Sequence, residues 1–254
     1  LQDEIARRIA EQLKGSLAVD AAPAARVGID PVAYDAYLKG RAMYRARRNL
    51  PQVIALLEDA VARAPDFAAA WASLSLAREV AYWTTKPLQR IALGEALPGM
   101  RAAAERAVAL DPDAAITLHA LGNVARGDHR YADAERLYLR AIEAEPTYPD
   151  VREDYAELLF GVGRDEDSLA AARELVTMEP LVEIFWYRIA DLAATLDRQA
   201  LLDEAVAHMA EAAPDGINTT LAPVSLALYH GRVDEARAAF EAARARAPAA
   251  IAVD

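Results

Sequence analysis

The sequence predicts an all-α protein built from repeated helical hairpins, and three observations support this prediction. Ala, Leu, Glu and Arg, which favour helices, are abundant, and runs of β-branched and aromatic residues typical of strands are absent. Apolar residues recur with helical spacing through most of the chain. Prolines also follow one another at intervals of 34 residues, at Pro112, Pro146, Pro180, Pro214 and Pro248.

The segment 115–148 shows the pattern most clearly. Its first half carries an apolar stripe at i, i+3, i+4 and i+7, formed by Leu118, Leu121, Gly122 and Ala125. A second stripe follows in its second half, formed by Ala134, Tyr138, Leu139 and Ala141. The pair Gly127-Asp128 between them is typical of a turn, and Pro146 prevents the second helix from continuing. The segment is therefore expected to be a helical hairpin.

A period of 34 residues, with Trp, Leu, Gly and Tyr in the first helix, Ala and an aromatic residue in the second, and a closing proline, resembles the tetratricopeptide repeat (TPR) family. The resemblance covers residues from about 33 to 250. It implies a right-handed α-solenoid of about six hairpins within an array at 31–250. The expected hairpins lie near 33–65, 68–112, 115–146, 149–180, 183–214 and 217–248.

Residues 1–30 are expected to form an amphipathic helix and a linker. Leu1, Ile5, Ile9 and Leu13 are spaced four apart and would share one face of this helix. The stretch resembles the closing helix of the domain that precedes TPR arrays in some bacterial cyclases and winged-helix regulators. One interpretation is that the apolar stripe forms a homodimer, and another is that it packs on the first repeat. Because the chain begins at Leu1 and not at Met, we expect it to be a piece of a longer protein.

Two repeats depart from the regular length. The second contains an insertion within residues 81–99, expected to lengthen its first helix and to add a loop. A lid, or a small-ligand site near Tyr82 and Trp83, is an alternative interpretation of this insertion. In the sixth repeat Pro223 predicts a short first helix. Large aromatic side chains are expected to fill the gaps between repeats, namely Trp71, Tyr138, Trp186 and Phe240.

The TPR resemblance also implies a concave groove lined by the first helix of each repeat. Residues displaced from the core stripe would face it. In the first three repeats these are Tyr37, Arg41, Arg45, His119, Asn123 and Arg126. In the later repeats they are Glu153, Glu157, Phe160, Tyr187, Asp191, Leu221 and Ser225. The groove would change from basic and aromatic to acidic, which suits a peptide of mixed charge. The alternative for each residue is a solvated surface without a partner.

Composition argues against several other functions. A net charge of −11 does not favour nucleic acid, since phosphate binding needs clustered positive charge. The chain has no cysteine, its four histidines lack metal-ligand spacing, and no catalytic or phosphate-binding motif is present. We therefore expect no enzyme activity, no cofactor and no metal. No apolar run is long enough to predict a membrane span.

Two functions remain from the sequence. The first is a scaffold that binds a partner protein or peptide in the groove, within a larger signalling or regulatory protein. The second is a structural segment that self-associates or packs on an upstream domain. The expected location is the cytoplasm, or the periplasm if a membrane anchor precedes the chain.

Overall fold

The computed structural model describes residues 28–45, 49–85, 96–214 and 216–246. All regular structure within these residues is helical, in twelve helices and without a strand, which confirms the predicted all-α class. The expected N-terminal helix, with Leu1, Ile5, Ile9 and Leu13, lies outside the described residues.

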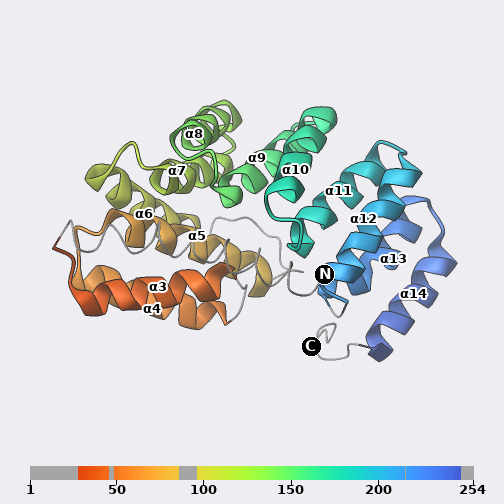
Figure 1. The fold of residues 1–254 in the computed structure, drawn as a ribbon, viewed down its shortest axis with the longest axis horizontal. Coiled ribbons are helices and arrows are strands. Elements are labelled where there is room, and N and C mark those ends of the chain that lie inside the picture. The colour runs from red at the N-terminus through yellow and green to blue at the C-terminus, as the bar shows by residue number, and fades with distance from the viewer. Residues whose placement is uncertain (1–27, 46–48, 86–95, 215, 247–254) are drawn as a thin grey trace, which may run out of the picture. The chain divides into compact units, whose positions relative to one another are not determined.

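The chain divides into two compact units, Leu1–Arg130 and Tyr131–Asp254. The described helices of unit 1 are α3 (Pro31–Arg45), α4 (Leu50–Arg63), α5 (Ala68–Thr85), α6 (Leu97–Leu110) and α7 (Ala115–Gly127). Within unit 1, α3 packs on α4, α4 on α5, α5 on α6, and α6 on α7 (Figure 1). The alternate helices α3, α5 and α7 also contact one another in sequence order, as the first helices of stacked hairpins do.

Unit 2 repeats this arrangement. Its helices are α8 (Tyr131–Ala144), α9 (Pro149–Gly161), α10 (Asp165–Met178), α11 (Glu183–Thr195), α12 (Gln199–Ala212), α13 (Ile217–Tyr229) and α14 (Val233–Arg246). The pairs α9–α10, α11–α12 and α13–α14 are hairpins, and each packs on the next through α10–α11 or α12–α13. The first helices α11 and α13 contact each other as well.

The turns before α8, α10, α12 and α14 share one backbone conformation at intervals of 34 residues. In each turn a left-handed residue lies two positions after the end of the preceding helix, at His129, Gly163, Asp197 and Gly231. The N–H of the following arginine donates to the carbonyl five residues before it, over 2.7–2.9 Å, at Arg130, Arg164, Arg198 and Arg232. These bonds satisfy carbonyls that a helix end leaves unpaired. The turn centre is therefore His129, two residues after the expected Gly127.

The closing prolines have a second role besides ending helices. The indole Nε1 of Trp71 donates to the carbonyl of Pro65 over 2.9 Å, and Trp186 makes the equivalent bond to Pro180 over 2.8 Å. Arg152 occupies the same position after Pro146 and reaches its carbonyl with Nη2 at 3.1 Å. A side chain six residues after the proline thus ties the loop to the helix that follows.

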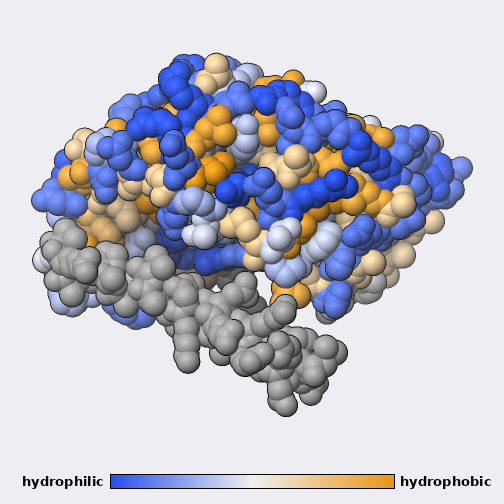
Figure 2. Space-filling view, turned by 45° about the horizontal axis from the view of Figure 1, so that its top comes forward, coloured by the Kyte–Doolittle hydropathy of each residue, from blue (hydrophilic) through white to orange (hydrophobic). Residues whose placement is uncertain are grey.

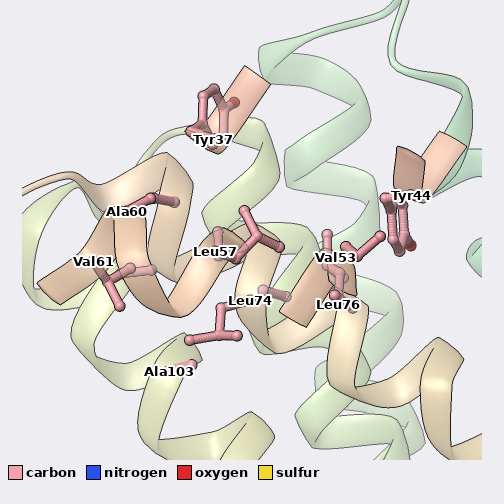
Figure 3. Packing of buried hydrophobic residues seen from close by; sticks show 14 of the residues in the cluster. Tyr37, Tyr44, Val53, Leu57, Ala60, Val61, Leu74, Leu76 and Ala103 are labelled. Carbon is pink, nitrogen blue, oxygen red and sulfur yellow. The ribbon is translucent and has the colours of Figure 1, made fainter. Parts of the chain in front are cut away.

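Small residues allow the helices to pack closely. Ala60 and Ala103 are buried in unit 1 beside Leu57 and Leu74 (Figure 3). A Cβ placed on Gly40 of α3 would lie 3.1 Å from Cγ of Leu57 on α4, which is closer than ordinary van der Waals contact. Close backbone approach leaves the space between helices to a few large side chains.

The structure differs from three of the expectations drawn from the sequence. Leu139 is 46% exposed, because Ala134, Tyr138 and Ala141 form the buried stripe of α8 and Leu139 lies one residue round the helix from it. The prediction of a short helix at Pro223 is wrong, since α13 runs the full 13 residues. Pro223 lies on an exposed face, where water can replace the hydrogen bond that its nitrogen cannot donate. Phe240 and Trp71 are only partly buried.

Hydrophilic residues cover much of the surface seen in Figure 2, with hydrophobic residues showing between them. Near the α13–α14 turn Leu228, Tyr229 and Val233 are exposed. None of the helices in the described ranges has the length and apolar character that a membrane span needs.

Replacing the fully buried Tyr138 by alanine should lower the free energy of unfolding by about 3–5 kcal/mol, since it removes a large side chain and leaves a cavity. Urea denaturation followed by circular dichroism measures the change. Tyr131, which is 43% exposed on the same helix, provides the matched control, and Tyr131→Ala should change stability by less than about 1 kcal/mol. Equal losses in the two variants would contradict the packing described for α8.

Candidate functional site

The side chains expected to face a groove fall into both units, and their environments differ. In unit 1, Tyr37, His119 and Asn123 are buried. Arg41 is partly buried and Arg45 is exposed. Tyr37 packs with its ring centroid 4.7 Å from that of Phe67, so it holds α3 against the start of α5.

Asn123 and Arg126 bind a carboxylate, but it belongs to the chain itself. Glu79 of α5 is buried, and Nδ2 of Asn123 donates to its Oε2 over 2.5 Å. Nη2 of Arg126 donates to the other oxygen, Oε1, over 2.8 Å. The network joins the first helices α5 and α7. Asn123 and Arg126, which were expected to face a partner, thus bind the carboxylate of Glu79.

In unit 2 the structure brings three of the expected acidic residues together around one arginine. Arg188 lies on α11, and its Nη2 is 3.8 Å from a carboxylate oxygen of Glu153 and 3.7 Å from one of Glu157, both on α9. Its Nη1 is 4.0 Å from Oδ2 of Asp191, one turn further along α11. We call these four side chains the acidic cluster. Because three carboxylates surround one guanidinium, the cluster carries net negative charge.

The contacts of Arg188 with its acidic neighbours are long, although its side chain is only 12% exposed. All three carboxylate distances exceed those of a hydrogen bond. Its buried Nε has no hydrogen-bond partner among the described residues. The sequence interpretation missed Arg188, although an arginine within 184–190, a run otherwise apolar and aromatic, was a signal that could have drawn attention to it.

Asp191 has an unusual environment for a carboxylate. It is one-third exposed, and no hydrogen-bond donor reaches its carboxylate in the described part of the chain. Burial raises the pKa of Asp191 above its ordinary value, and the positive charge of Arg188 opposes this rise. Desolvation disfavours the charged form, and the distant guanidinium compensates only partly.

A shallow pocket adjoins the acidic cluster, and Asp191 forms part of its wall. Helix α11 contributes residues spaced i, i+3, i+4 and i+7, namely Tyr187, Ala190, Asp191 and Ala194. Helix α13 contributes the same spacing through Ala222, Ser225, Leu226 and Tyr229, and Val206 of α12 completes the lining. Two first helices thus face each other across the pocket, with Asp191 as the one acidic side chain of its lining.

A cap between helices fixes the position of α13. Glu183, in the first turn of α11, accepts hydrogen bonds from the N–H of Thr219 over 2.8 Å and from its hydroxyl over 2.9 Å. These donors lie in the first turn of α13, where backbone N–H groups lack partners. A Cβ on Gly216 would lie 2.6 Å from the Glu183 carboxylate, so a larger residue there would displace that carboxylate from the cap. The cap holds the two walls of the pocket together.

The remaining expected residues have simpler surroundings. Phe160 is partly buried against the core of unit 2, and Leu221 is partly buried on α13. Tyr82 is buried near the end of α5, while the side chain of Trp83 and residues 86–95 lie outside the described part. Within the described residues, no group of three or more His, Asp or Glu side chains is placed to hold a metal ion.

Comparison with protein-family models and with curated proteins gave no match. Solved structures do match. PilW, described as a widely conserved type IV pilus biogenesis factor, superposes with a TM-score of 0.60 and 16% identity, over 87% of this chain and 96% of its own. PilF of Pseudomonas aeruginosa gives a TM-score of 0.54 and 18% identity, over 87% of this chain and 95% of its own. The chain thus has a TPR-type α-solenoid fold, and at these identities the likeness concerns the fold alone.

The Glu79–Arg126 pair should contribute to stability. Replacing Glu79 by alanine leaves Arg126 without this carboxylate and should lower the free energy of unfolding by about 2–3 kcal/mol. A double-mutant cycle of Glu79→Ala and Arg126→Ala should give a coupling energy above about 1 kcal/mol. The exposed pair Asp35–Lys39 is the control, with an expected coupling of about 0.5 kcal/mol or less. Equal coupling in the two pairs would show that burial does not strengthen the Glu79 network.

Asp191 should reduce stability at neutral pH. Since the pKa of Asp191 is raised in the folded state, its contribution to the free energy of unfolding is most favourable below the unfolded-state pKa, near 4. That contribution is lost as the pH rises through the folded-state pKa. The charged group beside it is Arg188, whose Nη2 also lies 3.8 Å from Glu153 and 3.7 Å from Glu157.

Asp191→Asn should therefore raise the Tm at pH 7, and the difference from the parent should disappear near pH 3, where the aspartate is protonated. Thermal unfolding between pH 3 and pH 8 measures this. Asp203→Asn, on the exposed face of α12, is the control and should have little effect. A lower Tm for Asp191→Asn at pH 7 would mean that attraction to Arg188 outweighs desolvation.

Proposed function

We propose that the chain is a non-catalytic interaction module that binds a partner protein or peptide through unit 2, on the face formed by α9, α11 and α13. The observation that carries this proposal is the pocket between α11 and α13, with Asp191 in its wall and the acidic cluster beside it. Pockets with mostly apolar walls and few polar groups are the usual form of a binding site.

The TPR-type fold supports the proposal, because stacked hairpins present long rows of first-helix side chains. The net charge of −11 supports a protein partner over a nucleic acid. The resemblance to TPR regions of bacterial cyclases and winged-helix regulators extends the proposal to a role within a larger signalling or regulatory protein in the cytoplasm.

The test begins with selection from a displayed library of random 12-residue peptides against the full chain, followed by fluorescence anisotropy with the best binder made synthetically. Two changes on the proposed face should each weaken binding at least about tenfold, or about 1.4 kcal/mol. Glu157→Lys reverses a charge in the acidic cluster at a side chain that is 43% exposed. Tyr229→Asp alters the half-exposed ring at the edge of the pocket.

Glu204→Lys is the matched control, because it reverses an exposed glutamate of α12 that does not line the pocket. It should leave the affinity unchanged, and circular dichroism should show that all variants remain folded. A failure to enrich any peptide over a control protein would overturn the proposed function. A peptide whose affinity is insensitive to Glu157→Lys and Tyr229→Asp would place the binding surface elsewhere.

A further inference from the structure

We infer that the pocket between α11 and α13 receives an apolar side chain of the partner, and that covering Asp191 in this way couples binding to the uptake of a proton. This inference rests on the proposed function and names what the same site recognises and how pH affects it. It depends on three features: the lining of the pocket, the exposed apolar side chains next to it, and the position of Asp191 in its wall.

The first feature is the lining, of which five residues out of nine are aliphatic. They come from α11, α12 and α13, and they are Ala190, Ala194, Val206, Ala222 and Leu226. The other members are two tyrosines and two polar residues, namely Tyr187, Tyr229, Asp191 and Ser225. An aliphatic or aromatic side chain would remove this apolar surface from water without giving up hydrogen bonds of its own. The lining therefore suits an apolar side chain.

The second feature is a group of exposed apolar side chains beside the pocket. Tyr229 ends α13, belongs to the lining and is half-exposed. Leu228 precedes it and Val233 begins α14, and both are more exposed than Tyr229. Three of the eight large hydrophobic side chains that are exposed in the described ranges thus lie within 228–233. Isolated side chains of this kind are common, whereas a group next to an apolar pocket favours a partner segment with more than one apolar residue.

The third feature is the carboxylate of Asp191. It is one-third exposed in the wall of the pocket, and Nη1 of Arg188 is 4.0 Å away. Burial within the fold already raises the pKa of Asp191. An apolar side chain beside it would remove more of its water and supply no hydrogen-bond donor, which penalises the charged form and not the neutral one. The pocket therefore binds the apolar side chain more tightly when Asp191 is protonated.

The direction of the pH dependence follows from this difference. The pKa of Asp191 is higher in the complex than in the free chain, so binding takes up a proton between the two values. Affinity is greatest below the pKa of the free chain and decreases as the pH rises to the pKa of the complex. A single proton changes the affinity by at most about tenfold for each pH unit.

Other titratable side chains stand on the helices around Asp191. At the pocket and in the acidic cluster they are Glu153, Glu157, Tyr187, Arg188 and Tyr229. On α12, His208 stacks on Trp186 of α11 with ring centroids 3.9 Å apart. Because histidines ordinarily change charge between about pH 5 and pH 8, a pH dependence of binding would not by itself single out Asp191. The ratio of the affinities of Asp191→Asn and the parent does, since the other titrations are common to both proteins.

The experiment uses the selected 12-residue peptide and the full chain, with affinities measured by fluorescence anisotropy between pH 5.5 and pH 8. At pH 8, Asp191→Asn should bind the peptide at least about threefold more tightly than the parent. This ratio should decrease toward one as the pH is lowered, because the parent then becomes neutral at the same position. Asp203→Asn removes an exposed carboxylate of α12 outside the lining, and it should bind like the parent at each pH.

A second measurement tests the apolar side chain. Each apolar residue of the peptide is replaced in turn by alanine, and one replacement should weaken binding to the parent at least about tenfold. The same replacement should cost at least about threefold less in Tyr229→Ala, because a ring that lines the pocket is then missing. Tyr131→Ala removes an exposed ring of α8 outside the lining, and there the full cost should remain.

Three results would overturn the inference while leaving the proposed function in place. In the first, the peptide binds and responds to Glu157→Lys and Tyr229→Asp, but none of its apolar residues is coupled to Tyr229. In the second, Asp191→Asn binds no more tightly than the parent, so the partner does not desolvate this carboxylate. In the third, the ratio of the two affinities is the same at every pH, so no proton is taken up by Asp191. If no peptide binds at all, the proposed function and the inference fail together.

Discussion

The fold depends on close contact between helices, and alanine is the residue that permits it. Fully buried alanines recur along both units, at Ala60, Ala70, Ala107, Ala134, Ala172 and Ala205. Each lets a neighbouring backbone approach, and the large side chains Leu57, Tyr138 and Met209 fill what remains. A hairpin cannot bury this surface alone, so its stability comes from the next hairpin. The regular turns follow from this requirement, because stacking works only when successive hairpins repeat the same geometry.

The two units share this scaffold but differ in the polar contacts that their first helices make. Glu79 in unit 1 has a donor on each oxygen, from Asn123 and Arg126, which makes a satisfied network between α5 and α7. In unit 2, Arg188 stands 3.7–4.0 Å from three carboxylates and hydrogen-bonds to none of them. A buried network in which each oxygen has a donor stabilises one arrangement of the helices that it joins. The units therefore share a fold but differ in the polar contacts of their first helices.

The repeat and the helices could be predicted from the sequence because they depend on spacing along the chain. The burial of individual polar residues could not, because it depends on partners that only folding brings near. Asn123 was placed on the right helix, yet its carboxylate partner, Glu79, lies 44 residues away. Arg188 was missed for the same reason, since its acidic neighbours lie on α9, in the preceding hairpin. Pro223 was misjudged because a proline's effect depends on whether its helix face meets water.

Asp191 differs from most of the carboxylates of this acidic chain. Most carboxylates of this sequence can be understood as surface charge that favours solubility, and those at helix starts also suit the helix dipole. Asp191 fits neither explanation, because burial raises its pKa and no donor among the described residues compensates. Its place in the wall of the pocket accounts for the raised pKa, because the helices around it remove part of the water that would stabilise its charged form.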